Sequence, residues 1–177
     1  MSIADLNFIL ALGVVAMQIA SAIVLLAYLW PEKVPNAKDI LALVGTWGLK
    51  VLFLLSLTGS IMTLVYSDIL GFEPCPLCWW QRIFLYPQII LFGMALWKEK
   101  YREAAIDFAI VLSMIGAAFA LYHHALQMMP AGTLPCPATG PSCAQLTLLE
   151  FGYVTFPMMA FALFCLTIVA ALVLRRP

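Results

Sequence analysis

The chain has 177 residues, of which 64% are hydrophobic and 10% are charged, and nine basic side chains balance nine acidic ones. Soluble domains carry about 25% charged residues, so this composition excludes an ordinary water-soluble globule. The abundance of apolar residues excludes a disordered chain. A neutral chain also lacks the basic surface that nucleic-acid binding requires. The composition therefore predicts a small integral membrane protein.

Five apolar stretches follow one another along the chain, separated by short segments that hold most of the charged residues. They comprise residues 6–29, 40–66, 74–97, 108–126 and 151–174. A helix needs about 20 apolar residues to cross a bilayer, and none of the stretches has the alternating pattern of a membrane β-barrel. We therefore expect an all-α integral membrane protein with five transmembrane helices.

The basic residues predict how these helices are oriented. Most of them lie in the first loop, the third loop and the C-terminal tail, namely Lys33, Lys38, Lys98, Lys100, Arg102, Arg175 and Arg176. Basic loops remain in the cytoplasm, which puts the N-terminus outside and the C-terminus inside. Lys50 can extend to the inner surface from the start of the second helix. Arg82 is then the one basic residue near the outer side.

Four of the five cysteines fall in the two outer loops. Cys75 and Cys78 form a C-x-x-C pair, whereas six residues separate Cys136 from Cys143. Cys165 lies within the last apolar stretch, where we expect a small packing residue. A C-x-x-C pair facing an oxidising compartment is typical of reversible disulfide chemistry. Structural disulfides and a four-cysteine zinc site are alternatives, although zinc-binding pairs are usually spaced more closely than the second pair.

The residues around the first pair favour a reactive Cys78. Pro76 suits the first position of a helix, so we expect Cys75 at the N-cap and Cys78 in the first turn. Free backbone N–H groups in that turn, together with Arg82 one turn further on, stabilise a thiolate. Alternatively, Arg82 could anchor the helix in the membrane interface beside the two adjacent tryptophans.

A dithiol that faces oxidants needs an electron acceptor. The sequence contains no haem motif, flavin fingerprint or phosphate-binding loop, so we expect a lipid-soluble quinone reached from the bilayer. Arg82 could stabilise both the thiolate and the reduced quinone oxygen. His123 and His124 end the fourth apolar stretch near the same surface. Because successive helical residues differ by about 100°, we expect only one of the two to face inward.

Three segments carry a resemblance to a known family. Residues 74–82 contain the C-x-x-C pair and an arginine four residues after its second cysteine; residues 122–124 read Tyr-His-His; and residues 135–152 contain the second pair followed by Glu-Phe-Gly. In this order they resemble the quinone-proximal motif, the Tyr-x-His and the second cysteine loop of disulfide bond formation protein B (DsbB) and its BdbC-like relatives. The resemblance covers roughly residues 45–174.

The resemblance implies an enzyme that reoxidises a DsbA-like thioredoxin-fold dithiol oxidase and passes two electrons to ubiquinone or menaquinone. It implies that Cys136 forms the mixed disulfide with this soluble partner. Cys143 is then the mate of Cys136 and can exchange with Cys75. Cys78 is expected to lie against the quinone, where Arg82 assists it.

The resemblance also implies a location and an extra helix. The expected location is the bacterial cytoplasmic (inner) membrane, with the N-terminus and the cysteine loops outside. The family pattern has four helices, so we expect residues 1–40 to form an additional helix and a cytoplasmic loop, and residues 41–177 to form a DsbB-like four-helix core. His124, rather than His123, matches the family histidine and is expected to bind the quinone. No metal is expected.

Two other interpretations differ in chain order or in chemistry. In membrane thiol–quinone enzymes of the vitamin K epoxide reductase type, the loop cysteines precede the C-x-x-C pair, whereas here Cys75 and Cys78 come first. A scaffold whose outer loops are locked by disulfides would tolerate replacement of Arg82 and bind no quinone. The six residues between Cys136 and Cys143 are fewer than in the best-known DsbB proteins, which limits how far these two cysteines can move apart.

Overall fold

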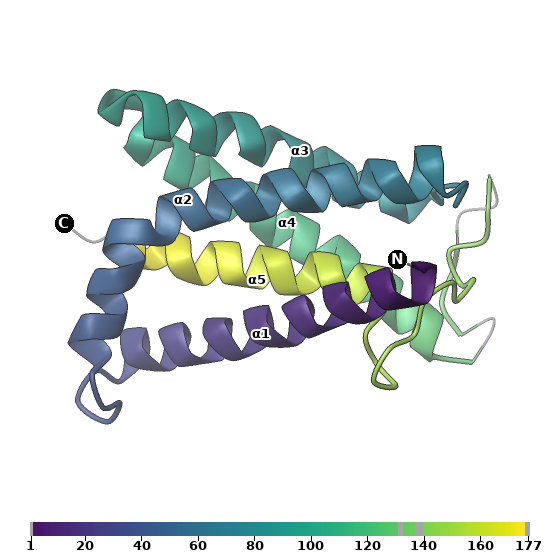
Figure 1. Ribbon diagram of the computed structural model, residues 1–177, viewed down its shortest axis with the longest axis horizontal. Helices are drawn as coiled ribbons and strands as arrows, with labels where there is room; N and C mark the ends of the chain where they lie inside the picture. Colours follow the sequence, from purple (N-terminus) through teal and green to yellow (C-terminus); the bar gives the residue numbers. More distant parts are fainter. Residues whose placement is uncertain (1, 131–132, 137–139, 176–177) are drawn as a thin grey trace.

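The computed structural model describes residues 2–130, 133–136 and 140–175, which form an all-helical bundle (Figure 1). Within these ranges there are five long helices: α1 (Ile3–Leu29), α2 (Ala37–Leu64), α3 (Pro76–Trp97), α4 (Arg102–Met128) and α5 (Phe156–Leu174). Two short helical segments, η1 (Val65–Ile69) and η2 (Glu99–Tyr101), extend α2 and lead into α4. The expected all-α class is confirmed.

The long helices run side by side (Figure 1). The segment that precedes α3 and the described parts of the segment that joins α4 to α5 lie at one end of the bundle, where α1 also begins. The helix α5 finishes at the opposite end. The start of α1 and both cysteine-bearing loops therefore share one side of the molecule.

Most of the bundle has the length and hydropathy of membrane-spanning helices. Among the described residues, four helical segments are long and apolar enough to cross a membrane: Ile3–Leu29, Ala37–Ile69, Glu99–Met128 and Phe156–Leu174. These segments make the chain a multi-pass membrane protein. The helix α3 is less apolar because it carries Gln81, Arg82 and Gln88. Its 22 residues extend about 33 Å, enough for a bilayer, but its crossing stays a prediction.

Local sequence decides where the helices next to the cysteine loops begin. Pro76 occupies the first turn of α3, as expected, and the Sγ atom of Cys75 accepts a hydrogen bond from the N–H of Cys78 at 3.4 Å. Thr155 caps α5 in the same way, because its Oγ1 atom accepts from the N–H of Met158 at 3.4 Å. Both helix starts are thereby held at the end of the bundle that carries the cysteines.

The helices α3, α4 and α5 pack tightly because most residues on the buried face of α4 are small, including Ala109, Ser113, Gly116 and Ala120. A Cβ atom at Gly116 would come within 2.5 Å of the Phe164 ring, so only glycine allows α5 this close. Towards α3, the amide of Gln88 donates to the Ser113 hydroxyl at 3.0 Å. The interior of this part of the bundle is therefore closely filled.

The first helix is packed into the same bundle (Figure 1). Near its start, Ala11 and Val14 are buried against Val154 and Ala162. Further along, Val24 packs with valines of α5. The apolar stretch that the sequence placed outside the four-helix core thus lies directly beside α5.

Candidate functional site

The four loop cysteines meet at one end of the bundle. The Sγ atoms of Cys75 and Cys78 lie 3.1 Å apart. The Cys143 thiol is within hydrogen-bonding reach of both Cys75 and Cys136, and its backbone N–H donates to the Cys136 sulfur at 3.2 Å. The sulfurs therefore form a row in the order Cys136, Cys143, Cys75, Cys78. Cys75, Cys78 and Cys143 carry thiols, not disulfides, in the structure.

The two inner thiols of this row are buried and hold their protons firmly. Cys75 is 5% exposed, and its hydrogen bond to Cys78, together with burial, raises the pKa of the Cys75 thiol to about 12. Burial and the hydrogen bonds from neighbouring cysteines also raise the pKa of Cys143, which is 1% exposed. The N–H of Leu77, a free donor in the first turn of α3, opposes this shift by donating to the Cys143 sulfur. Both inner thiols need stabilisation by neighbouring groups to react as thiolates.

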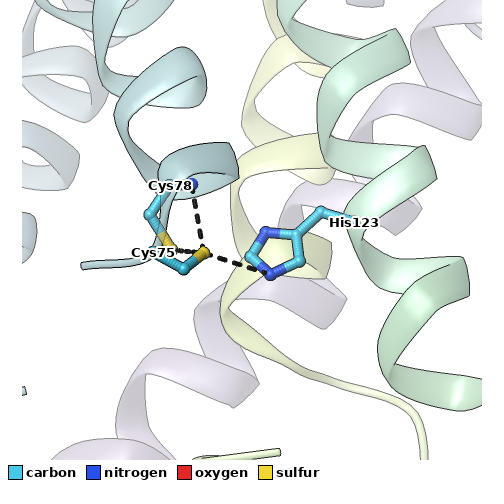
Figure 2. Close-up of side chains that lie close together, drawn as sticks. All are labelled: Cys75, Cys78 and His123. Carbon is cyan, nitrogen blue, oxygen red and sulfur yellow. Dashed lines mark hydrogen bonds between the residues drawn. The ribbon is translucent and has the colours of Figure 1, made fainter. Parts of the chain in front are cut away.

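His123 of α4 points at this row, and Figure 2 shows its ring directed toward Cys75. Its Nε2 atom lies 3.6 Å from the Cys75 sulfur and 3.1 Å from the Cys143 carbonyl oxygen. Its Nδ1 atom lies 2.9 Å from Nε2 of Gln81. Because a carbonyl oxygen can only accept, the contact with Cys143 places the ring proton on Nε2, and Nδ1 of His123 accepts from the Gln81 amide. The buried imidazole therefore presents a hydrogen-bond donor to Cys75 and the Cys143 carbonyl.

His124 lies on a different face of α4. Its Nδ1 atom is 2.9 Å from Oγ1 of Thr155, the residue that caps α5. The structure brings His123, not His124, to the cysteines. A quinone role for His124 stays a prediction.

The sequence carried a signal for the inward position of His123. The small residues on the buried face of α4 follow one another at steps of three and four: Ala109, Ser113, Gly116 and Ala120. A further step of three residues reaches His123, which lies on the same buried face. His124 is rotated from His123 by about 100° around the helix axis and so lies off this face. Gln81 had no comparable signal, because its role depends on which residue of α4 lies opposite.

A cavity of about 390 Å³ lies beside Cys78 and is lined mainly by residues of α1, α2, α3 and α5. Apolar side chains make up most of its wall, and α3 contributes Cys78 and Arg82 to it. Arg82 is buried, with 8% of its surface exposed. Its Nη2 atom donates a hydrogen bond to the Thr63 carbonyl at 2.8 Å. The centre of the guanidinium lies 5.1 Å from the centre of the Trp79 ring. Within the described ranges Arg82 forms no ion pair, so the guanidinium retains N–H donors for a ligand oxygen. His124 is not among the described residues that line this cavity.

The same cluster has a spacing that metal sites also use. The sulfurs of Cys75 and Cys78 and a ring nitrogen of His123 lie within 4.8 Å of one another. Thiolate and imidazole ligands at such distances suit a zinc ion. Sulfurs that exchange disulfides must approach one another just as closely, so the geometry by itself is compatible with both kinds of chemistry.

Comparison with known proteins identifies the family of the chain. The sequence profile of the family "Disulfide bond formation protein DsbB" matches residues 45–174. The chain belongs to the DsbB family. The resemblance seen in the sequence is confirmed, and the matched region contains all four loop cysteines, Arg82 and both histidines.

Individual DsbB-family relatives share about a third of the aligned residues. The chain is 38% identical over 116 residues to the SPbeta prophage-derived disulfide bond formation protein B of Bacillus subtilis, covering 66% of this chain and 77% of the relative. It is 33% identical over 134 residues to a "Probable disulfide formation protein" of Metapseudomonas resinovorans, covering 74% and 92%. It is 32% identical over 138 residues to disulfide bond formation protein C of Bacillus subtilis, covering 77% and 94%. No solved structure matches the chain.

The DsbB match defines which part of this structure is shared with the family. It begins within α2, so α1 lies outside it. The row of sulfurs, the His123–Gln81 pair and Arg82 lie inside it. The cavity beside Cys78, by contrast, is lined both by residues of the matched region and by residues of α1, which lies outside it.

Proposed function

We propose that this DsbB-family protein is a thiol oxidase. It reoxidises a DsbA-like thioredoxin-fold partner outside the cytoplasm and passes two electrons to a membrane quinone, ubiquinone or menaquinone. The observation that carries the proposal is the row of four sulfurs that starts at the partly exposed Cys136 and ends with Cys78 at an apolar cavity. Structural disulfides would require no such row, and no buried guanidinium beside its last member.

The outer pair performs the exchange with the soluble partner. When Cys136 and Cys143 form a disulfide, a thiolate of the partner attacks the Cys136 sulfur and Cys143 leaves as a thiolate. The N–H of Leu77 stabilises that leaving sulfur. The second thiol of the partner then resolves the mixed disulfide. The partner leaves with a disulfide, and Cys136 and Cys143 have gained its two electrons and two protons.

The inner pair reoxidises the outer pair. The thiolate of Cys143 attacks Cys75 of a Cys75–Cys78 disulfide, and Cys78 leaves as a thiolate in the first turn of α3. Cys136 then attacks Cys143, and Cys75 leaves. The Nε2–H of His123 donates to this leaving sulfur. The products are a Cys136–Cys143 disulfide and the reduced inner pair.

The cavity fits a quinone. Its wall is apolar, its volume lies within the usual range for ligand pockets, and Arg82 supplies N–H donors at the side of Cys78. A quinone bound there supplies the acceptor for two electrons and two protons. Thr63 and Trp79 hold the guanidinium in place, while Cys78 and Cys75 are the two sulfurs that form the disulfide again.

The location follows from the same proposal. All five helices cross the bacterial cytoplasmic (inner) membrane, α3 included, and the N-terminus and cysteine loops lie outside. Residues 1–40 provide an additional helix and a cytoplasmic loop, and residues 41–177 provide the DsbB-like core. The shared position of the α1 start and the cysteine loops at one end of the bundle supports this arrangement (Figure 1).

The test is a reconstituted reaction. Purified protein in detergent is mixed with a reduced thioredoxin-fold dithiol oxidase and decylubiquinone, and both dithiol loss and quinone absorbance are followed. We expect Cys78→Ser to lower the rate at least about 10³-fold, as loss of a reacting nucleophile does. Cys165→Ser, in the interior of α5, serves as the matched control and is expected to turn over normally. Undiminished turnover by Cys78→Ser, or a wild type that reduces neither decylubiquinone nor a short-chain menaquinone, would contradict the proposal.

A further inference from the structure

The first helix lies outside the DsbB match, yet it supplies part of the cavity wall. The α1 residues that line the cavity are Ile9, Leu10, Gly13, Val14 and Met17. Their spacing of three and four residues places them in one stripe along the helix. The helix therefore turns a continuous face toward the cavity that contains Cys78 and Arg82.

Hydrogen bonds hold α1 on both sides of this stripe. Before it, the Tyr66 hydroxyl donates to Oδ1 of Asn7. After it, the Tyr153 hydroxyl donates to Oε1 of Gln18 at 2.8 Å. Tyr66 itself lines the cavity, so the first bond joins α1 to another part of the cavity wall. These contacts fix the stripe in position against the cavity.

The opposite face of α1 is open to the surroundings of the bundle. Leu12 is 48% exposed, Ile19 55% and Ile23 43%, although all three are large apolar residues. In a helix that is long and apolar enough to cross the membrane, such residues face lipid. The helix α1 therefore lies between part of the cavity and the bilayer.

The stripe leaves room for a flat or flexible ligand. No atom lies within 4 Å of the position that a Cβ at Gly13 would take, so this part of the wall is open space. Met17 faces the same cavity as Met62 of α2 and Met159 of α5. Methionine side chains are unbranched and polarisable, which lets them adapt to rings and apolar chains of different shape.

We propose that α1 is a quinone-contacting wall that decides which quinones reach Cys78, with Gly13 and Met17 as contact residues. The inference rests on the proposed function, because it assigns the acceptor of that reaction to this cavity. The absence of a side chain at Gly13 admits the acceptor, and a bulky side chain there excludes it. The DsbB-family core alone would leave this side of the cavity open to lipid.

The first experiment introduces a large side chain at Gly13, where the cavity wall has open space. Gly13→Phe is compared with Leu12→Phe, which places the same ring on the lipid-facing side of the same turn. We expect Gly13→Phe to raise the KM for decylubiquinone about tenfold or more, because the ring overfills the cavity. Single-turnover oxidation of the soluble dithiol by the oxidised protein, without added quinone, should be unchanged. Leu12→Phe should match the wild type in both assays. An unchanged KM in folded Gly13→Phe would overturn the proposal.

The second experiment needs no variant and does not measure turnover. The wild-type protein is irradiated with an azido-substituted ubiquinone analogue, with and without excess decylubiquinone, and the labelled peptides are mapped by mass spectrometry. We expect displaceable labelling of residues 9–17. Displaceable labelling confined to α2 and α3 would refute the role of α1 and leave the proposed function intact. No displaceable labelling together with no quinone reduction would refute both.

Discussion

The two sides of α3 are built in opposite ways. Toward α4 the interface is closed: Gln81 pairs with His123, Gln88 pairs with Ser113, and all four side chains are buried. On the other side, Arg82 borders a cavity of about 390 Å³. The helix thus separates a tightly packed region, where sulfurs meet, from a hollow apolar region.

The contrast shows how neighbouring residues of one helix can serve two environments. Gln81 and Arg82 are adjacent in sequence and both line the cavity, but Gln81 also reaches His123 of α4, whereas Arg82 bonds to the Thr63 carbonyl of α2. Cys78 belongs to both regions, because it contacts Cys75 and also lines the cavity. Thiol exchange needs fixed, water-poor geometry, whereas a lipid-soluble acceptor needs space that it can enter. Placing α3 between the two meets both requirements.

The largest expected effect concerns the packed side. In the reduced protein, Cys75 should react with iodoacetamide about 10³-fold more slowly at neutral pH than in the unfolded chain, because only a thiolate reacts and the pKa of Cys75 is raised from 9.0 to about 12. The thiolate forms only as the pH rises toward 12. The rate should therefore keep climbing between pH 9 and 11, whereas it levels off in the unfolded chain.

Mass spectrometry of the alkylated peptide, at a series of pH values, measures this difference. Cys78→Ala is the informative variant, because the hydrogen bond to Cys78 is the largest cause of the shift. It should lower the pKa of Cys75 and speed the reaction near neutral pH. A wild-type rate that already levels off near pH 9 would show that the hydrogen bond to Cys78 and burial do not raise the pKa of the Cys75 thiol.

An intermediate effect is expected on the hollow side. Arg82→Gln removes the charge that borders the cavity, and a hydrogen bond from a charged donor contributes enough to change affinity about 10- to 100-fold. We expect the KM for decylubiquinone to rise by that factor. The control is Arg102→Gln. Arg102 is also a basic residue, but it pairs with Glu99 of η2. Equal KM values in the two variants would remove Arg82 from the quinone site.

The smallest expected effect distinguishes the two histidines. His123→Phe keeps a ring but loses the Nε2–H that faces Cys75, and we expect the exchange between the two cysteine pairs to slow about tenfold. His123→Gln retains an N–H donor and should lose less. His124→Phe should leave this exchange unchanged, because His124 bonds to Thr155 instead.

Rapid-quench trapping of the disulfides, followed by mass spectrometry, separates this step from quinone reduction. The hydrogen bond from His123 also lowers the pKa of Cys75, so the pH dependence of the exchange should shift to higher pH in His123→Phe, which a loss of packing alone would not cause. If His124→Phe slowed the exchange as much as His123→Phe, the assignment of His123 would fail.

Much of the architecture was predictable because membrane helices are specified locally. The apolar stretches marked the five helices, Pro76 marked the start of α3, and the absence of basic residues from the cysteine loops placed both pairs on one side. The C-x-x-C pair with Arg82 one turn later also indicated redox chemistry. Each of these signals depends on neighbouring residues in the chain or on its partition between water and lipid.

The remaining features depend on how the helices pack. Composition and spacing determined a membrane protein with two cysteine pairs on one side, but not that Cys143 would lie against the first turn of α3. Only the tertiary structure decided that His123 rather than His124 reaches Cys75, because the outcome depends on the rotation of α4 against α3. It also decided that α1, which lies outside the family match, lines the cavity beside Cys78. Sequence periodicity shows which face of a helix is apolar, whereas packing determines what that face encloses.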